Sequence, residues 1–431
     1  MAWLLKGGRV VDPASGVDQV MDVLIENGVI AAAGHLSGAQ EAAGARVLDC
    51  TGKVVAPGLI DAGARLGEPG FEHRETIATA CEAAAVGGFA AVCALPETNP
   101  VVDDPGGVRF VLEASARAPV RVYPMAAATR QAAGQRLVEA GLLKRAGAVA
   151  LADPGGIQNG GVLRRVLEYA RMFDLPVVER PRDASLAGDG VMHEGAAATV
   201  RGLKGIPAAA EEAAVARAVI LAEMTGARLH LAPVSTAGSV ELVRRAKERG
   251  VPVTAGTTPH HLTAVDEDVE AHDARWKVDP PLRTEADREA LRDAVRDGVV
   301  DVIFTDHAPF AREEWELEFD AAPFGISGLE TALALLLHDL VLPGRLPLAA
   351  LIERMSVAPA RLFGLPGGSL APGAPADVTV IDLQAARTVD PESGRSLGRN
   401  TPFAGRRLTG WAWAVLVGGR LVMHEGRVLD A

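Results

Sequence analysis

Residues 54–70 are Val54-Val55-Ala56-Pro57-Gly58-Leu59-Ile60-Asp61-Ala62-Gly63-Ala64-Arg65-Leu66-Gly67-Glu68-Pro69-Gly70. The segment begins as an apolar run rich in branched side chains and is bounded by turn residues, a pattern typical of a buried β-strand. In a parallel barrel, such a strand delivers the residues that follow it to the mouth, where reactive groups gather. The residues after Asp61 are mostly alanine and glycine. The segment therefore resembles an active-site strand from which the reactive side chains are missing.

Alternating strand and helix patterns follow this segment through the middle of the chain. Short apolar runs predict strands, and helix-forming stretches separate them. The predicted strands span 89–95, 120–126, 148–152, 175–179, 227–232, 251–258 and 299–305, and the clearest helices span 76–86, 108–118, 209–224, 237–249 and 285–297. Together with the opening strand they form a row of βα-type units, which is the pattern of a (β/α)8 TIM-type barrel.

The two chain ends differ from this middle region but resemble each other. Both carry short apolar runs separated by glycine turns, which predict antiparallel strands. A length of 431 residues suits a barrel of roughly 250 residues plus a smaller domain. We therefore predict an α/β fold with a barrel over 55–366 and a small discontinuous β-sandwich domain over 1–54 plus 367–431. A doubly wound sheet is the alternative architecture, but it would not explain the split β domain.

The composition excludes several classes of function. The formal net charge of −12 argues against a nucleic-acid or anionic-membrane partner, because both need a basic surface. No apolar run approaches the roughly 20 residues of a membrane span. Cys50, Cys81 and Cys93 show no metal-type spacing, and the N-terminus shows no signal-peptide pattern. We expect a soluble, cytoplasmic protein with reduced cysteines, and the sequence leaves open whether it forms a homo-oligomer.

Short motifs stand at the predicted strand ends, where a barrel places its reactive residues. In chain order they are Pro57-Gly58-Leu59-Ile60-Asp61, Glu68-Pro69-Gly70, Leu95-Pro96-Glu97-Thr98-Asn99-Pro100, Val234-Ser235-Thr236, Thr258-Pro259-His260-His261-Leu262, Pro280-Pro281-Leu282-Arg283, Thr305-Asp306-His307-Ala308-Pro309, Ala322-Pro323-Phe324-Gly325-Ile326 and Gly328-Leu329-Glu330-Thr331. This series resembles the dihydroorotase branch of the cyclic amidohydrolases over nearly the whole chain. The resemblance implies a zinc hydrolase that interconverts carbamoyl aspartate and dihydroorotate in pyrimidine biosynthesis. One or two metal ions would polarise the amide carbonyl and supply a hydroxide, and an aspartate would shuttle the proton.

The chain departs from this family at the metal site. The resemblance places the family's histidine ligands at four positions that carry other residues here, namely Gly63, Arg65, Arg180 and Pro233. The two aspartates that complete the site, Asp153 and Asp306, remain. We therefore expect no metal and no cofactor, with Asp306 a vestige of the catalytic aspartate. The alternative is a different, complete zinc site that draws on histidines near strand ends: His230, His260, His261 and His307.

Two arginines stand where the resemblance places metal ligands. We hypothesise that Arg65 and Arg180 replace the positive charge of the metal by pairing with Asp153 and Asp306. Such pairing would offset a desolvation cost of several kcal/mol for each buried carboxylate. The simpler alternative is that both arginines point into solvent.

The positions that would hold the substrate have changed as well. The resemblance places an arginine at Gly67, asparagines at Glu97 and Asp279, and a histidine at Phe310. These changes remove two potential cations and add two anions. We therefore expect the pocket to repel a dicarboxylate such as carbamoyl aspartate.

Turn and packing motifs persist although the reactive residues do not. A retained fold with a lost site suggests a scaffold, and the family includes non-catalytic dihydroorotase-like subunits that assemble with aspartate transcarbamoylase. We therefore predict a catalytically inactive dihydroorotase homologue that is a structural partner of aspartate transcarbamoylase. The alternative is an active dihydroorotase-type cyclic amidohydrolase with an unusual or mononuclear metal site, which would need zinc. We also expect residues 327–342 to form a core helix and His193 to lie in a surface loop.

Overall fold

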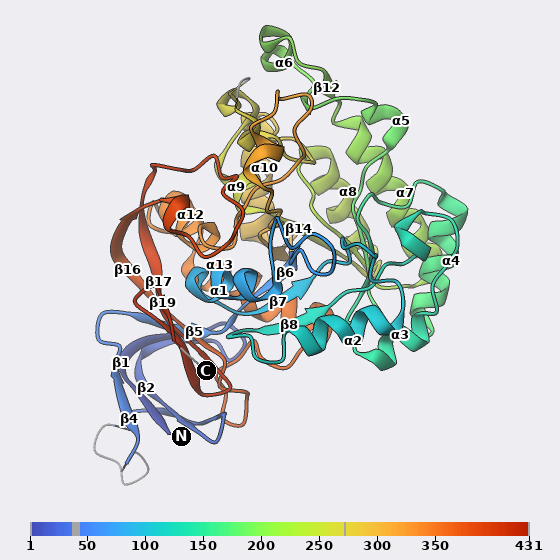
Figure 1. The fold of residues 1–431 in the computed structure, drawn as a ribbon. Coiled ribbons are helices and arrows are strands. Elements are labelled where there is room, and N and C mark those ends of the chain that lie inside the picture. Colours follow the sequence, from blue (N-terminus) through green and yellow to red (C-terminus); the bar gives the residue numbers. More distant parts are fainter. Residues whose placement is uncertain (1, 37–43, 271–272, 430–431) are drawn as a thin grey trace.

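A barrel surrounded by helices lies beside a sheet built from both chain ends (Figure 1). The computed structural model describes residues 2–36, 44–270 and 273–429. The blue N-terminal strands and the red C-terminal strands meet in the same sheet, while the cyan, green and yellow segments form the barrel region. The predicted fold class, an α/β barrel with a β domain drawn from both ends, is confirmed.

The terminal sheet has nine strands in the described part of the chain. They are β1 (Trp3–Asp12), β2 (Val17–Glu26), β3 (Val29–Gly34), β4 (Arg46–Asp49), β5 (Val54–Pro57), β16 (Val378–Thr388), β17 (Arg407–Val417), β18 (Arg420–His424) and β19 (Arg427–Val428). β5 joins the two ends, because it pairs in parallel with β1 and antiparallel with β16. Apolar side chains from both ends, including Leu5, Ile25 and Val380, form one buried cluster.

The barrel strands run parallel to one another in a three-stranded and a five-stranded sheet. They are β6 (Leu59–Ala64), β7 (Phe89–Ala94), β8 (Arg121–Pro124), β9 (Leu151–Asp153), β10 (Val177–Glu179), β13 (Leu229–Leu231), β14 (Val253–Thr257) and β15 (Val302–Ile303). Parallel bridges connect the two sheets, one between Ala126 and Leu151 and one between Ala64 and His307. These bridges close the barrel, so the carboxyl ends of its strands meet at one mouth.

Helices alternate with these strands. They are α1 (Ile77–Gly87), α2 (Pro105–Ala114), α3 (Ala140–Ala146), α4 (Gly160–Arg171), α5 (Ala184–Ala187), α6 (Ala196–Arg201), α7 (Ala209–Thr225), α8 (Ala237–Glu248), α9 (Pro259–Thr263), α10 (Glu285–Asp297), α11 (Arg312–Trp315), α12 (Ala332–Leu336), α13 (Leu348–Ile352) and α14 (Ala358–Phe363), with a small two-stranded sheet of β11 (Met192–His193) and β12 (Gly205–Ile206). Threonine hydroxyls cap the N-termini of α1, α8 and α10, where backbone N–H groups have no helical partner. Across the described residues, no helix combines the length and the apolar character that crossing a membrane requires.

The segment 54–70 divides between the two parts of the molecule and does not form one strand. β5 lies in the terminal sheet, β6 begins the barrel, and Gly58 stands between them. The Gly58 amide donates to the carbonyl of Asp377 at 2.8 Å, and the Leu59 amide donates to Thr379 Oγ1 at 3.1 Å. A Cβ atom at position 58 would approach a barrel side chain to 2.6 Å. The joint is therefore too tight for any residue but glycine.

The core helix predicted over 327–342 is shorter in the structure: α12 begins at Ala332 and continues as a π-helix over Leu337–Val341. Its apolar side chains are mostly buried, and it contacts more than the barrel. α12 packs on β17 of the terminal sheet, and Leu333 and Leu337 are fully or almost fully buried. Gly410 of β17 has a φ of 94°, and a Cβ there would lie 2.8 Å from Leu337. This close contact joins the terminal sheet to the barrel.

Candidate active-site pocket

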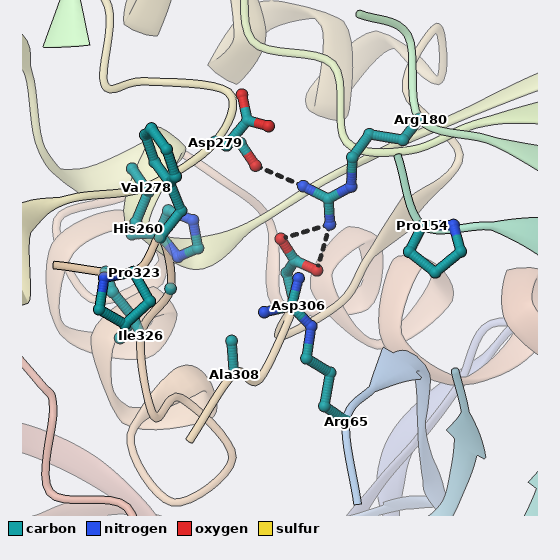
Figure 2. Close-up of a pocket in the computed structure, with 12 residues that line it drawn as sticks. Arg65, Pro154, Arg180, His260, Val278, Asp279, Asp306, Ala308, Pro323 and Ile326 are labelled. Carbon is teal, nitrogen blue, oxygen red and sulfur yellow. Dashed lines mark hydrogen bonds and ion pairs between the residues drawn. The ribbon is translucent and has the colours of Figure 1, made fainter. Parts of the chain in front are cut away.

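The carboxyl ends of several barrel strands surround a pocket of about 340 Å³. Figure 2 shows Arg180 and Asp306 in its interior, with Arg65 below them and His260 on the opposite wall. Its lining residues are Arg65, Pro154, Arg180, His260, Val278, Asp279, Asp306, Ala308, Pro323, Phe324, Gly325 and Ile326. The parallel barrel brings these residues together although they are far apart in the sequence.

Arg180 pairs with Asp306, as predicted. Arg180 directly follows β10, and its Nη2 donates to both carboxylate oxygens of Asp306 at 2.8 and 3.0 Å. Nη1 of the same guanidinium donates to the backbone carbonyl of Asp279. The Arg180 and Asp306 side chains are 12% and 11% exposed. Burial opposes the charge of Arg180, but Asp306, Asp279 and Glu97 outweigh it and raise the pKa of this guanidinium above its ordinary value.

Arg65 does not pair with Asp153 or Asp306, which corrects the second half of that hypothesis. Arg65 donates from both Nε and Nη2 to the carboxylate of Glu97, and the Nη2 contact measures 3.1 Å. Arg65 follows β6 and Glu97 follows the neighbouring β7, so the barrel places the two residues side by side. The alternative that both arginines point into solvent is wrong as well.

Asp153 obtains its hydrogen bonds from the segment after β8 and not from an arginine. Its Oδ1 accepts the backbone N–H groups of Ala128 and Thr129 at 2.8 and 3.1 Å, and its Oδ2 accepts the Thr129 hydroxyl at 2.5 Å. Burial raises the pKa of Asp153 although these donors act against the shift. This carboxylate is therefore held by neutral donors and is not directed at a metal.

The residues at the predicted metal positions do not fit a zinc centre. Gly63 and Pro233 have no donor atom, and both oxygens of Asp306 already bind Arg180. The Phe304 ring occupies the space in front of Gly63, where an added Cβ would lie 3.2 Å from Phe304 Cδ2. The described chain contains no group of three or more His, Cys, Asp or Glu side chains arranged to hold a metal ion. Zinc needs about four converging ligands, and the described residues do not supply them.

The histidines near the strand ends do not form another zinc site in the described chain. Both ring nitrogens of His261 are hydrogen-bonded, one to a threonine hydroxyl and one to a backbone carbonyl. His307 accepts the backbone N–H of Gly328 at Nδ1, so its Nε2 carries the proton toward Glu75. His230 is bonded to Thr254 inside the barrel. Three of the four candidates therefore serve the fold, and His260 faces the pocket alone.

The predicted substrate positions are closed or paired. Gly67 has a φ of 76°, and a Cβ there would lie 2.0 Å from a backbone oxygen, so no side chain fits. Glu97 is paired with Arg65, and Asp279 lies 3.6 Å from Arg182. The added anions therefore carry their own cations, and the pocket is less negative than the sequence suggests. Among the described residues that line it, both cations, Arg65 and Arg180, are already paired, so none is free to attract a dicarboxylate.

Phe310 belongs to a second hollow of about 330 Å³ beside the first. The Arg74 guanidinium lies over the rings of Phe71 and Phe310, with 4.5 and 5.1 Å to their centroids. Arg65 and Pro154 line both hollows. Where the resemblance predicts a histidine, the protein has an apolar wall.

Comparisons with known proteins agree with this architecture. Residues 52–239 match the family described as "Dihydro-orotase-like". The chain is 51% identical over 427 residues to a protein named dihydroorotase from Pelotomaculum thermopropionicum, with 99% of each chain covered. It is 49% identical over 427 residues to a dihydroorotase from Anaeromyxobacter sp. strain K, with 98% of each covered. The chain belongs to the dihydroorotase family.

A solved structure similar to this dihydroorotase-family chain is an L-hydantoinase from Arthrobacter aurescens. The TM-score is 0.89 at 26% identity, and the match covers 99% of this chain and 97% of the hydantoinase. The similarity extends over both the barrel and the terminal sheet. The amidohydrolase fold of this family member is therefore retained throughout.

Sequence reasoning missed two residues that shape the site of this dihydroorotase-family protein and misplaced a third residue outside it. Phe304 fills the space beside Gly63, and the signal was a bulky ring directly before Thr305-Asp306. Arg182 neutralises Asp279, and it stands two positions after Arg180. His193 is buried, not in a surface loop, because Arg283 Nη1 donates to its Nδ1 at 3.1 Å. No sequence signal pointed to that last pair.

Proposed function

We propose that this chain is a dihydroorotase-family protein that does not hydrolyse cyclic amides and acts as a structural partner of aspartate transcarbamoylase. One observation carries the loss of chemistry: the guanidinium of Arg180 binds both oxygens of Asp306. In the resembling enzymes, the equivalent aspartate must be free to hold metal and shuttle a proton. A carboxylate in a two-oxygen contact with arginine forms a charge-assisted ion pair, and neither of its oxygens is then free for a metal.

The lost ligands support the same proposal independently of Arg180. Converting Gly63 or Pro233 to a donor would need a new side chain, and Gly67 has no room for one. Hydrolysis by the family mechanism needs a polarising metal and an activated water. The described residues provide no ligand set for such a metal.

The retained fold supports the scaffold half of the proposal. The joint at Gly58, the capped helices and the contact of α12 with β17 all maintain the barrel and the terminal sheet in one body. The fold is therefore complete although Gly63 and Pro233 stand where the resemblance places metal ligands. We infer aspartate transcarbamoylase as the partner from the resemblance to non-catalytic dihydroorotase-like subunits.

The names of the relatives favour a second candidate, an active dihydroorotase. Proteins at 51% and 49% identity over 427 residues are named dihydroorotase, and the similarity covers almost the entire chain. This candidate requires a catalytic arrangement that differs from the family's ligand set. It would use zinc through residues other than the four lost positions.

Metal content and turnover distinguish the two candidates. The purified chain should contain far less than one zinc per protein by elemental analysis, and it should show no dihydroorotate hydrolysis with or without added zinc. The Pelotomaculum protein, purified in the same way, is the matched control. Stoichiometric zinc together with turnover that a chelator abolishes would establish the second candidate and overturn the first.

The partner is tested by purification with the aspartate transcarbamoylase of the same organism. Light scattering after size-exclusion chromatography should show one species containing both chains. Separate elution at micromolar concentrations of both proteins would refute the partnership while leaving the loss of catalysis intact.

A further inference from the structure

Another pocket, of about 200 Å³, lies where the barrel meets the terminal sheet. Figure 1 shows this region, in which α12 lies beside β16 and β17. Val86 of α1 and Glu330, just before α12, line the pocket from the barrel, while Arg387 of β16 and Trp411 of β17 line it from the sheet. The pocket shares no lining residue with the pocket at the barrel mouth. Its chemistry is therefore independent of whether the barrel mouth holds a metal.

The third wall of this pocket is the segment between β16 and β17, which hydrogen bonds hold in place. Oε1 of Glu330 accepts the backbone N–H groups of Arg395 and Ser396 at 2.8 and 3.1 Å. Nη1 of Arg399 donates to the backbone carbonyl of Gly394 at 3.2 Å. These contacts order the wall before any ligand arrives, which lowers the entropy cost of binding.

Oppositely charged side chains line this pocket without pairing with each other. Oε2 of Glu330 has no hydrogen-bond partner among the described residues, and no described carboxylate forms an ion pair with Arg387 or Arg399. The Arg387 guanidinium instead lies over the Trp411 ring, 5.7 Å from its centroid. Burial raises the pKa of Glu330 above its ordinary value, although backbone donors and the nearby Arg399 act against the shift. Positive and negative groups therefore line the same small pocket with a gap between them.

This arrangement suits a ligand that carries both charges. A simple anion would be attracted by the two guanidinium groups and repelled by Glu330, and a simple cation would meet the reverse. A zwitterion offers an ammonium to Glu330 and a carboxylate to the arginines, so neither end needs to face a like charge. Asp390, the other charged residue of the lining, is exposed to solvent and is screened there. The pocket is smaller than the roughly 300–1,000 Å³ typical of drug-sized ligands, which limits the ligand to a small metabolite.

We propose that this pocket binds a free amino acid with an apolar side chain. The ammonium group donates to Oε2 of Glu330, and the carboxylate accepts hydrogen bonds from Arg387 and Arg399. Val86 and Trp411 supply apolar surface for the side chain. Because the barrel and the terminal sheet both line the pocket, the bound amino acid connects the two parts of the molecule and stabilises the folded state.

L-Leucine and two analogues test this proposal, because the three share a branched chain and differ in charge. Isocaproate lacks the ammonium group, and isoamylamine lacks the carboxylate. In calorimetry with the full chain, we expect L-leucine to bind and each analogue to bind about tenfold more weakly or not at all. L-Leucine should also raise the melting temperature. Equal binding of L-leucine and either analogue, or no L-leucine binding in the millimolar range, would overturn the proposal.

Charge-removing variants assign the two ends of the ligand. Glu330→Gln keeps an acceptor for the backbone N–H groups but removes the charge, so it should lose most of the preference for L-leucine over isocaproate. Arg399→Gln should instead reduce the preference for L-leucine over isoamylamine. Arg395→Gln is the control, because Arg395 belongs to the same segment, pairs with Glu82 at 3.8 Å and does not line the pocket. If folded Glu330→Gln and Arg399→Gln proteins kept both preferences, or weakened all three ligands equally, the proposal would be refuted.

Discussion

Phe304 and Gly63 are complementary across the mouth of the barrel. The Phe304 ring fills the space in front of Gly63, and a Cβ at position 63 would lie 3.2 Å from Phe304 Cδ2 and 3.4 Å from Cε2. A residual cavity of about 30 Å³ separates this contact from Asp153, Arg180 and Asp306. The barrel interior is therefore repacked around the missing side chain and is not simply empty.

Restoring the first-strand histidines should harm the protein without recovering a metal site. Gly63→His must displace the Phe304 ring, and overpacking of this kind costs about 1–3 kcal/mol of unfolding free energy. The double variant Gly63→His/Arg65→His should be less stable in urea titration and should bind no stoichiometric zinc. Gly155→His is the control, because a Cβ at position 155 meets nothing within 4 Å. Tight zinc binding by the double variant would contradict the repacking argument.

Removing the cation of the Arg180–Asp306 pair should destabilise the fold strongly. Arg180→Met leaves the Asp306 carboxylate buried without its partner, which costs about 3–5 kcal/mol in comparable buried pairs. Adding Asp306→Asn to that variant removes the orphan charge and should recover much of the loss. Urea unfolding of the wild type, both single variants and the double variant measures the coupling.

An exposed pair provides the reference for that experiment. Arg164 and Glu168 form an i,i+4 ion pair with side chains 55% and 46% exposed. Arg164→Met should change the unfolding free energy by only about 0.3–0.5 kcal/mol. Equal effects of Arg164→Met and Arg180→Met would show that the buried pair has no special role.

The thermal stability of the chain should not depend on divalent metal. A ligand that binds only the folded state raises the melting temperature, and its removal lowers it. Because the described residues form no metal-binding cluster, neither a chelator nor added zinc should shift the melting temperature. A large downward shift with chelator, as expected for a zinc-loaded relative measured in parallel, would contradict this prediction.

Glu179 should make the stability depend on pH. It is 1% exposed, its Oε2 has no partner in the described chain, and burial raises its pKa from 4.5 to about 8. The folded state therefore binds this proton more tightly than the unfolded state. Its favourable contribution is complete below about pH 4.5 and is lost as the pH rises to about 8.

Glu179→Gln removes this proton linkage while keeping the side-chain volume and an acceptor for the Ile157 amide. The free energy of unfolding of the variant minus that of the wild type should rise between about pH 4.5 and pH 8 and then level off. Glu168→Gln, on the exposed face of α4, should show no such trend in the same unfolding series. A flat difference for Glu179→Gln across this range would contradict the assignment.

The sequence was sufficient for the barrel and for the origin of the terminal sheet. Each predicted strand overlaps an observed one, for example 175–179 with β10 and 227–232 with β13, because apolar runs between turns leave little choice. The division at Gly58 was missed because a continuous apolar run does not show which of two sheets each half joins. That choice depends on Asp377 and Thr379, far away in the sequence.

The sequence predicted which ligand side chains are absent from the site better than it predicted the contacts of the residues that replace them. The absent ligands at Gly63 and Pro233 can be read directly from a motif comparison, and so can an arginine at position 180. The partner of Arg65 could not, since Glu97 becomes its neighbour only when β6 and β7 pair. Asp153 was misassigned because its partners are backbone N–H groups, which no motif specifies.

The joint at Gly58 also sets an order of events on the ribosome. Leu59 and Thr379, which are hydrogen-bonded there, are separated by 320 positions. At about 5–20 residues per second, the second leaves the ribosome on the order of half a minute after the first. During that interval, β5 can pair with β1 but has no β16 to cover its other edge. Translation speed therefore determines how long the nascent chain exposes this edge, and with it the time available for binding to chaperones or for aggregation.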